Sequence, residues 1–297
     1  MHLTLRQLEI FEAVARLQSF TQAAKQLHLS QPAVSMQVKQ LEDSVGLPLV
    51  EQAGKQIFLT DAGREMYGYA RSISELLEEA DNVFDALKGG EKGQLSISVA
   101  TTASHFATRL LAAFSKLHEN VNISLDITNR ETLRRQIESN ERDLIIMGKP
   151  PADMDVEAVP FMENPLVMIA SPAHPLFSPT RIPLSTFENE AFVVREQGSG
   201  TRGATERFFR EHDIPFHPGI EMTSNEAIKQ AVEAGLGLGI VSIHTLELEL
   251  ETGRLAILDV EDFPIIRHWY IINRRGKRLS PVAEAFKEFV ISEAKNY

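Results

Sequence analysis

One long amphipathic helix, predicted over residues 61–88, most constrains how this chain can fold, because it separates two segments of different pattern. Its apolar positions alternate in steps of three and four residues, the 3.5-residue period of a coiled-coil seam. These positions are Met66, Tyr69, Ile73, Leu76, Ala80, Val83 and Leu87. Thr60 is a candidate cap, and three glycines within residues 89–93 predict a hinge. The helix could pack on its own domain, but the strict period favours a dimer of two copies.

Residues 1–60 predict three short helices and a hairpin. Apolar residues recur at helical spacing from Leu5 to Ala15 and again from Thr21 to Leu27. The third helix follows Ser30, a good cap, and stops at Gly46. Residues 47–51 and 55–59 then resemble the two strands of a hairpin, or wing.

The outward face of the third helix has the character of a DNA-reading surface. It carries short hydrogen-bonding or apolar groups and one cation, which suits entry into a major groove. The predicted DNA contacts centre on Gln31, Pro32, Ser35, Met36 and Lys39, with Ser30 beside them and Thr21 and Lys55 on phosphates. The alternative is an ordinary three-helix domain with a solvated polar face.

Charge requires any DNA-binding surface to be local. The chain holds 30 Lys and Arg against 41 Asp and Glu, a net charge of −11, so bulk charge cannot attract DNA. Residues 17–41, however, contain Lys25 and Lys39 and no acidic residue. The basic surface therefore coincides with the second and third predicted helices.

The remaining two thirds of the chain alternate strands and helices, which predicts a parallel α/β sheet. The predicted strands are residues 94–100, 121–128, 143–147, 166–171, 191–194, 239–242 and 265–273. The predicted helices are residues 106–118, 131–140, 201–212, 225–234, 244–252 and 280–293.

Two hydroxyl-rich turns predict an anion site, because ligands in such sheets lie beyond the carboxyl ends of strands, at helix N-termini. The first contains Thr101, Thr102 and Ser104, and the second contains Ser199, Gly200 and Thr201. Further candidates are Asn129, Arg130 and Asn225, the last as a helix cap pointing inward. Taken singly, each hydroxyl could be an ordinary helix cap.

Several chemistries find no support in the sequence. Cysteine is absent, which excludes disulfides and thiolate metal sites, and the histidines lack metal-binding spacing, so we expect no metal and no cofactor. Gly235, Gly237 and Gly239 follow a predicted helix and precede a strand, the reverse of a dinucleotide-binding fingerprint. The sequence has no run of about 18 apolar residues, so no membrane helix is predicted. The N-terminus lacks the basic and then apolar pattern of a signal peptide, so we expect a cytoplasmic location.

Residues 3–65 resemble the winged helix-turn-helix of the LysR-type transcriptional regulators. The resemblance rests on F-x-x-V-A-x-x-x-S-F-T-x-A-A, S-Q-P-A-V-S, L-E-x-x-x-G-x-x-L and L-T-x-A-G, all present here. Many members have arginine where Met36 stands and two arginines in the wing, where this chain has Gln52 and Lys55. Both changes remove guanidinium groups that could read guanine or hold phosphate.

The resemblance implies an architecture: a winged helix-turn-helix domain (residues 1–60), a dimerisation helix (61–88), a hinge (89–93) and an effector domain (94–297). The effector domain would be two-lobed, like periplasmic solute receptors, with lobe I at 94–160 and 267–297 and lobe II at 161–266. The family implies double-stranded DNA with an inverted-repeat operator, a dimer assembling to a tetramer, and RNA polymerase as a further candidate partner.

The segments SVATTASHFATRLLAAF and DLIIMGKPP are similar to the branch that controls Rubisco operons and inorganic-carbon uptake. That likeness implies a small anionic effector; candidates are ribulose 1,5-bisphosphate, 2-phosphoglycolate, phosphoenolpyruvate and NADPH. Regulation by aromatic or other carboxylates is the alternative within the family. An α/β enzyme acting on a phosphorylated metabolite is a less favoured alternative, because no nucleophile, metal set or cofactor loop is evident. A solute receptor would leave residues 1–60 unexplained.

Overall fold

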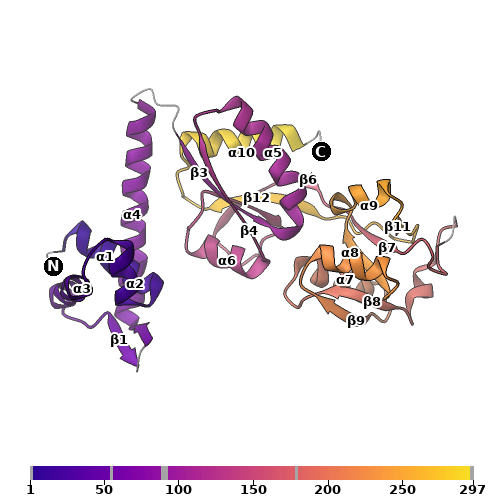
Figure 1. The fold of residues 1–297 in the computed structure, drawn as a ribbon, viewed down its shortest axis with the longest axis horizontal. Coiled ribbons are helices and arrows are strands. Elements are labelled where there is room, and N and C mark those ends of the chain that lie inside the picture. The colour runs from indigo at the N-terminus through magenta and orange to yellow at the C-terminus, as the bar shows by residue number, and fades with distance from the viewer. Residues whose placement is uncertain (1–2, 54–55, 88–92, 178–179, 295–297) are drawn as a thin grey trace. The chain divides into compact units, whose positions relative to one another are not determined.

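The computed structural model describes residues 3–53, 56–87, 93–177 and 180–294. The chain divides after Leu87 into two compact units, and each is described by itself (Figure 1). Within the described ranges, no helix combines the length and apolar character needed to cross a membrane.

The first unit is a three-helix domain with a hairpin and a long final helix. Its elements are α1 (Leu5–Leu17), α2 (Phe20–Gln26), α3 (Gln31–Val45), β1 (Val50–Ala53), β2 (Gln56–Leu59) and α4 (Asp61–Leu87). Phe11, Val34 and Leu41 are fully buried in its core. Ser19 caps α2 by accepting the N–H of Gln22, so that helix begins at Phe20, one residue earlier than predicted.

Helix α4 begins where its cap was predicted, since Thr60 Oγ1 accepts the N–H of Gly63 at 3.0 Å. Met66 and Ile73, two predicted seam residues, pack partly against the core of their own domain, which is what the single-chain alternative anticipated. Tyr69 and Leu76 are 66% and 63% exposed and remain available to a partner. Ala80 is half-buried, while the side chains of Val83 and Leu87 lie outside the described residues.

The second unit contains two five-stranded sheets, one in each lobe. The lobe I sheet has the order β4-β3-β5-β12-β6. Its strands are β3 (Gln94–Ala100), β4 (Asn122–Thr128), β5 (Leu144–Gly148), β6 (Val156–Glu163) and β12 (His268–Arg274). Helices α5 (Ser104–Leu117) and α10 (Pro281–Glu293) cover one face, and α6 (Arg130–Glu138) covers the other (Figure 1). Both faces are therefore apolar and buried.

The lobe II sheet has the order β11-β7-β10-β8-β9. Its elements are β7 (Leu166–Ala170), β8 (Ala191–Arg195), α7 (Gly200–Glu211), β9 (His217–Met222), α8 (Asn225–Glu233), β10 (Leu238–Ser242), α9 (Glu247–Glu251) and β11 (Ala256–Ile257). Phe209 of α7 packs on one face and Ile228 of α8 on the other. Short 3₁₀ turns occur at Thr101–Ala103, Leu184–Phe187 and Ile243–Thr245.

The fold class is confirmed, but the prediction of purely parallel sheets is wrong. Strand β12 runs antiparallel to both β5 and β6, and β7 runs antiparallel to β10 and β11. Two parallel strands need a crossover connection, usually a helix, that returns the chain to the end of the sheet where the first strand began. Strand β12 instead enters lobe I directly from lobe II, which allows it to insert antiparallel between β5 and β6.

The two connections between the lobes lie side by side. Strand β6 keeps the chain in the lobe I sheet as far as Glu163, so the crossing comes slightly later than the predicted Phe161. The return passes Arg267, and the N–H of Asn164 donates to the Arg267 carbonyl oxygen at 2.7 Å.

Candidate functional site

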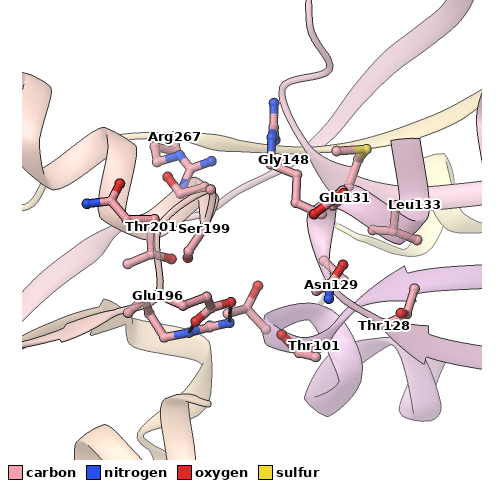
Figure 2. A pocket seen from close by; sticks show the side chains of 18 of the residues that line it. Thr101, Thr128, Asn129, Glu131, Leu133, Gly148, Glu196, Ser199, Thr201 and Arg267 are labelled. Carbon is pink, nitrogen blue, oxygen red and sulfur yellow. Dashed lines mark hydrogen bonds and ion pairs between the residues drawn. The ribbon is translucent and has the colours of Figure 1, made fainter. Parts of the chain in front are cut away.

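A cavity of about 180 Å³ lies between the lobes of the second unit (Figure 2). Figure 2 shows Thr101, Thr128 and Asn129 on one side of the opening and Ser199, Thr201 and Arg267 on the other. The lining residues are Ala100, Thr101, Thr102, Thr128, Asn129, Arg130, Glu131, Leu133, Met147, Gly148, Arg195, Glu196, Gln197, Gly198, Ser199, Gly200, Thr201, Arg267 and Trp269. They come from the carboxyl ends of strands and from helix starts, as expected for a ligand site in α/β sheets.

Most of the predicted anion-site residues line this cavity: Thr101, Thr102, Asn129, Arg130, Ser199, Gly200 and Thr201. Ser104 does not, because its hydroxyl donates to the Thr101 carbonyl oxygen at 2.8 Å. Asn225 does not either; its Oδ1 accepts from Arg195 Nη1 at 2.9 Å, beneath the cavity. Ser224, not Asn225, caps α8 by accepting the N–H of Ala227, which corrects the predicted cap.

The helix starts around the cavity offer polar groups to an anion. Ser199 precedes α7, yet its hydroxyl makes no capping hydrogen bond to that helix. Across the cavity, the 3₁₀ turn Thr101–Ala103 leads directly into α5. Asn129 caps α6 by accepting the Thr132 N–H at 2.9 Å, so its amide nitrogen is the atom left for a ligand. Helix N-termini carry a partial positive charge that favours anions.

Two arginines approach the same point in the cavity from different segments. A Cβ built on Gly200 would lie 3.2 Å from Arg267 Nη2 and 3.6 Å from Arg130 Nη1. Arg267 Nη1 donates to the Gly200 carbonyl oxygen at 3.0 Å, and Arg130 Nη2 donates to the Lys149 carbonyl oxygen at 2.9 Å. Within the described parts of the chain, neither guanidinium forms an ion pair with a carboxylate.

The charge of this pair is not compensated. Burial first, and then the positive charges of Arg130 and Arg207, together lower the pKa of Arg267 to about 10. Burial also lowers the pKa of Arg130, with the charge of Arg134 as the second cause. A bound anion would stabilise both charged forms.

Two acidic residues also line the cavity, but one of them is neutralised. The Glu196 carboxylate receives two hydrogen bonds from the buried Arg195, at 2.7 Å from Nε and 2.8 Å from Nη2. Glu131 is exposed in the first turn of α6. On the cavity wall, the indole Nε1 of Trp269 is buried and has no hydrogen-bond partner among the described residues.

Sequence reasoning missed Arg267, Arg195, Glu196 and Trp269. Arg267 falls inside the segment 265–273, which was predicted to be a strand. A lone arginine near the start of an apolar strand, at the point where the chain returns between lobes, was the available signal. The Arg195–Glu196 pair had none, because a charged pair after a strand usually faces solvent.

In the first unit, the predicted DNA-reading side chains share one face of α3. Gln31, Pro32 and Lys39 are exposed, Met36 is 54% exposed, and Ser35 is half-buried. Gln31 Nε2 donates to Ser35 Oγ at 3.1 Å. Ser30 caps the helix by accepting the Ala33 N–H. Thr21 is exposed on α2, and Lys55 lies outside the described residues.

Comparison with known proteins identifies both units. Residues 5–64 match the family described as bacterial regulatory helix-turn-helix protein, lysR family, and residues 88–295 match the LysR substrate binding domain. The RuBisCO operon transcriptional regulator of Allochromatium vinosum is 57% identical over 294 residues, covering 99% of this chain and 97% of that protein. The HTH-type transcriptional activator CmpR of Synechocystis is 45% identical, covering 97% of this chain and 95% of that protein.

Solved structures of effector domains match the second unit. The Synechocystis CcmR regulatory domain in complex with 2-PG is 42% identical, with a TM-score of 0.66, and covers 69% of this chain and 98% of that chain. Members of the matched families are transcription regulators rather than enzymes. This chain belongs to the LysR family of DNA-binding transcriptional regulators.

Proposed function

We propose that this regulator controls genes of carbon fixation or inorganic-carbon uptake, and that a small phosphorylated anion in the cavity between its lobes sets its activity. The name of the similar RuBisCO operon regulator supports the pathway. The 2-PG complex of the CcmR domain supports the ligand class. The observation that carries the proposal is the meeting of Arg130 and Arg267 at Gly200, where neither guanidinium has an ion-pair partner among the described residues.

The cavity favours a compact phosphate over the other candidate effectors. Its volume of about 180 Å³ is below the range of about 300–1,000 Å³ that encloses drug-sized ligands. We therefore rank 2-phosphoglycolate and phosphoenolpyruvate before ribulose 1,5-bisphosphate, and NADPH last because the cavity cannot enclose a dinucleotide. A phosphate dianion can also take two guanidiniums at once, whereas an aromatic carboxylate brings one charge and an apolar ring.

The proposal includes an assembly. Residues 1–60 would read DNA, 61–88 would pair two chains, 89–93 would act as the hinge, and 94–297 would bind the effector. The exposed side chains of Tyr69 and Leu76 support a second copy on α4. Two paired chains would read an inverted repeat, and effector domains would join dimers into a tetramer. Such a regulator would work in the cytoplasm beside DNA, with RNA polymerase as a further partner.

The test is calorimetric titration of the full-length protein with 2-phosphoglycolate, with glycolate as the matched compound that lacks only the phosphate. We expect saturable binding of the first and at most weak binding of the second. A thermal unfolding scan should agree, because ligand at 100 times its dissociation constant stabilises by about 2.7 kcal/mol. Equal affinity for both compounds would show that the site does not select phosphate.

The regulatory half of the proposal needs a DNA readout. The probe is the promoter region upstream of the Rubisco genes, with a coding fragment of equal length as control. We expect specific retardation of the promoter fragment and a changed complex when 2-phosphoglycolate is added. Retardation of both fragments alike would contradict the proposed target.

A further inference from the structure

We infer that Glu42 is a positioning residue: it fixes helix α3 against helix α4 through the main chain of Leu49, and so sets the half-site spacing that a dimer accepts. This inference rests on the proposed pairing of two chains through α4. Glu42 is not among the predicted DNA contacts, and its carboxylate accepts hydrogen bonds from the main chain of Leu49 and Val50, so its role would be indirect.

The Glu42 carboxylate holds the start of the hairpin. Its side chain is only 11% exposed, although it sits on a surface helix. Oε1 accepts the N–H of Leu49 at 2.8 Å and the N–H of Val50 at 3.3 Å. Hydrogen bonds from main-chain N–H groups to an ionised carboxylate are among the stronger ones in proteins. The chain that leaves α3 is therefore fastened back onto α3 at β1.

The same short segment is held from the other side by α4. The Thr60 N–H donates to the Leu49 carbonyl oxygen at 3.1 Å, and Thr60 Oγ1 donates to the Pro48 carbonyl oxygen at 2.6 Å. Gly63, in the first turns of α4, lies so close that a Cβ there would overlap the Leu49 carbonyl oxygen. The Leu49 side chain is fully buried. The Leu49 peptide is thus clamped between both helices.

This clamp has a geometric consequence for a dimer. If α4 pairs with its copy, the direction of α3 relative to α4 determines how far apart the two DNA-reading faces lie. The distance between those faces must match the half-site spacing along the DNA. Without the carboxylate, the two N–H groups of Leu49 and Val50 lose their acceptor, and α3 gains freedom relative to α4. The protein would then tolerate spacings that it otherwise rejects.

The test compares two DNA duplexes that differ only by one base pair inserted between the half-sites. Full-length Glu42→Ala should lower the ratio of affinities for the two duplexes by about tenfold, the effect expected from one charge-assisted hydrogen bond. Affinity for a single half-site should change much less. A ratio equal to that of the unmodified protein would overturn the positioning role.

Three further variants make the result specific. Glu42→Gln keeps an acceptor oxygen and should retain most of the spacing preference. Asp43→Ala is the matched control, because Asp43 is an exposed acidic residue on the same helix. The Asp43 carboxylate lies 3.4 Å from Lys39 Nζ, and Glu42 Oε2 lies 3.6 Å from the same atom, so both variants remove a negative charge beside Lys39. Thr60→Val removes the hydrogen bond from Thr60 Oγ1 to the Pro48 carbonyl oxygen, which loosens the same segment from the α4 side. It should relax the spacing as Glu42→Ala does, and it provides a second test if Glu42→Ala fails to fold. An unmodified protein indifferent to spacing would instead refute the proposed pairing through α4.

Discussion

Arg267 Nη1 donates a hydrogen bond to the carbonyl oxygen of Gly200 at 3.0 Å, joining the segment that returns between the lobes to the first residue of α7. The other side of the same guanidinium faces Gly148, where a Cβ would lie 2.6 Å from Nη2. The group therefore fills the space between the end of β5 in lobe I and the start of α7 in lobe II. A ligand that binds this arginine acts on the connection between the lobes as well as on the cavity wall.

We predict that Arg267→Ala weakens 2-phosphoglycolate binding by about 10- to 100-fold, since hydrogen bonds to charged groups contribute about 1.5–3 kcal/mol. Arg130→Ala should have a similar effect, because both guanidiniums approach Gly200. Arg134→Ala is the control: it lies on the same helix as Arg130, but pairs with Glu138 and Asp153. Calorimetric titration of the three variants measures the difference. If Arg134→Ala weakened binding as much as the others, the effect would be one of long-range charge alone.

The lowered pKa of Arg267, about 10, predicts a pH dependence of ligand binding. Below about pH 9 the guanidinium is charged whether or not ligand is present, so affinity should be constant. Above pH 10 the empty site loses its proton while a bound anion favours the charged form. Affinity should therefore fall by up to about tenfold per pH unit. Titrations from about pH 8 to about pH 10.5 measure it, and the Arg267→Ala variant should give a flatter profile.

For the ligand-free protein, the lowered pKa of Arg267 predicts that stability rises with pH, whereas ligand affinity falls. The pKa of Arg267 is lower in the folded than in the unfolded chain, so burial of the charge costs stability at all pH values below about 10. This cost should decrease as the pH rises beyond that value. If the affinity for 2-phosphoglycolate stayed constant through pH 10.5 in the folded protein, Arg267 would not be a contact of the bound anion.

Edge strands explain most of what the sequence left unpredicted in the fold. Strands β6 and β9 each lie at the edge of a sheet, and each contains a proline, Pro160 and Pro218. Proline interrupts the sequence pattern of a strand. It is tolerated in an edge strand, because an N–H that points away from the sheet is not needed for a hydrogen bond to a neighbouring strand. Helices α1 to α3 were predictable because caps such as Ser30 and Gly46 mark their ends locally.

The cavity residues that lie next to strands and helix starts were predictable from the sequence, and those brought there by the tertiary fold were not. Thr101 directly follows β3, and Ser199 lies in the short turn between β8 and α7, so their place at the cavity can be inferred from local pattern. Arg267 reaches the cavity from a connection between lobes, which only the tertiary fold brings there. Asn225 was misplaced because Ser224 and Asn225 are both good helix caps, and sequence does not say which of two neighbours takes the role.

We predict that Thr101→Val and Thr201→Val each weaken the response to 2-phosphoglycolate while leaving operator binding without ligand nearly unchanged. Each change removes a hydroxyl from the cavity and keeps the side-chain volume. Thr205→Val is the control, because its hydroxyl donates to the Thr201 carbonyl oxygen at 3.0 Å and Thr205 does not line the cavity. Calorimetry and gel retardation measure the two properties. Loss of DNA binding with ligand affinity intact would show that the threonines serve the scaffold.

We predict that Lys39→Ala weakens binding to all DNA sequences and lowers the salt slope of binding by about one, as expected for one lost phosphate contact. Gln31→Ala should instead change base preference, because glutamine can read a base edge. Lys116→Ala, on α5 in the other unit, removes the same charge and should leave both quantities unchanged. Fluorescence anisotropy at several salt concentrations measures affinity and slope together. An unchanged slope in Lys39→Ala would place this lysine away from the DNA backbone.

The exposed apolar stripe of α4 predicts how the chains pair. Leu76 and Phe84 are 63% and 58% exposed, which is costly for large apolar side chains unless a partner covers them. The double change Leu76→Asp and Phe84→Asp should place charge on this exposed apolar stripe and separate the paired DNA-binding domains. Sedimentation should then show a smaller assembly, and an inverted repeat should be bound no more tightly than a single half-site. Phe177→Asp, at a phenylalanine that is 51% exposed in lobe II, is the control and should leave both unchanged. A double variant that keeps its mass and its preference for the inverted repeat would place the seam elsewhere.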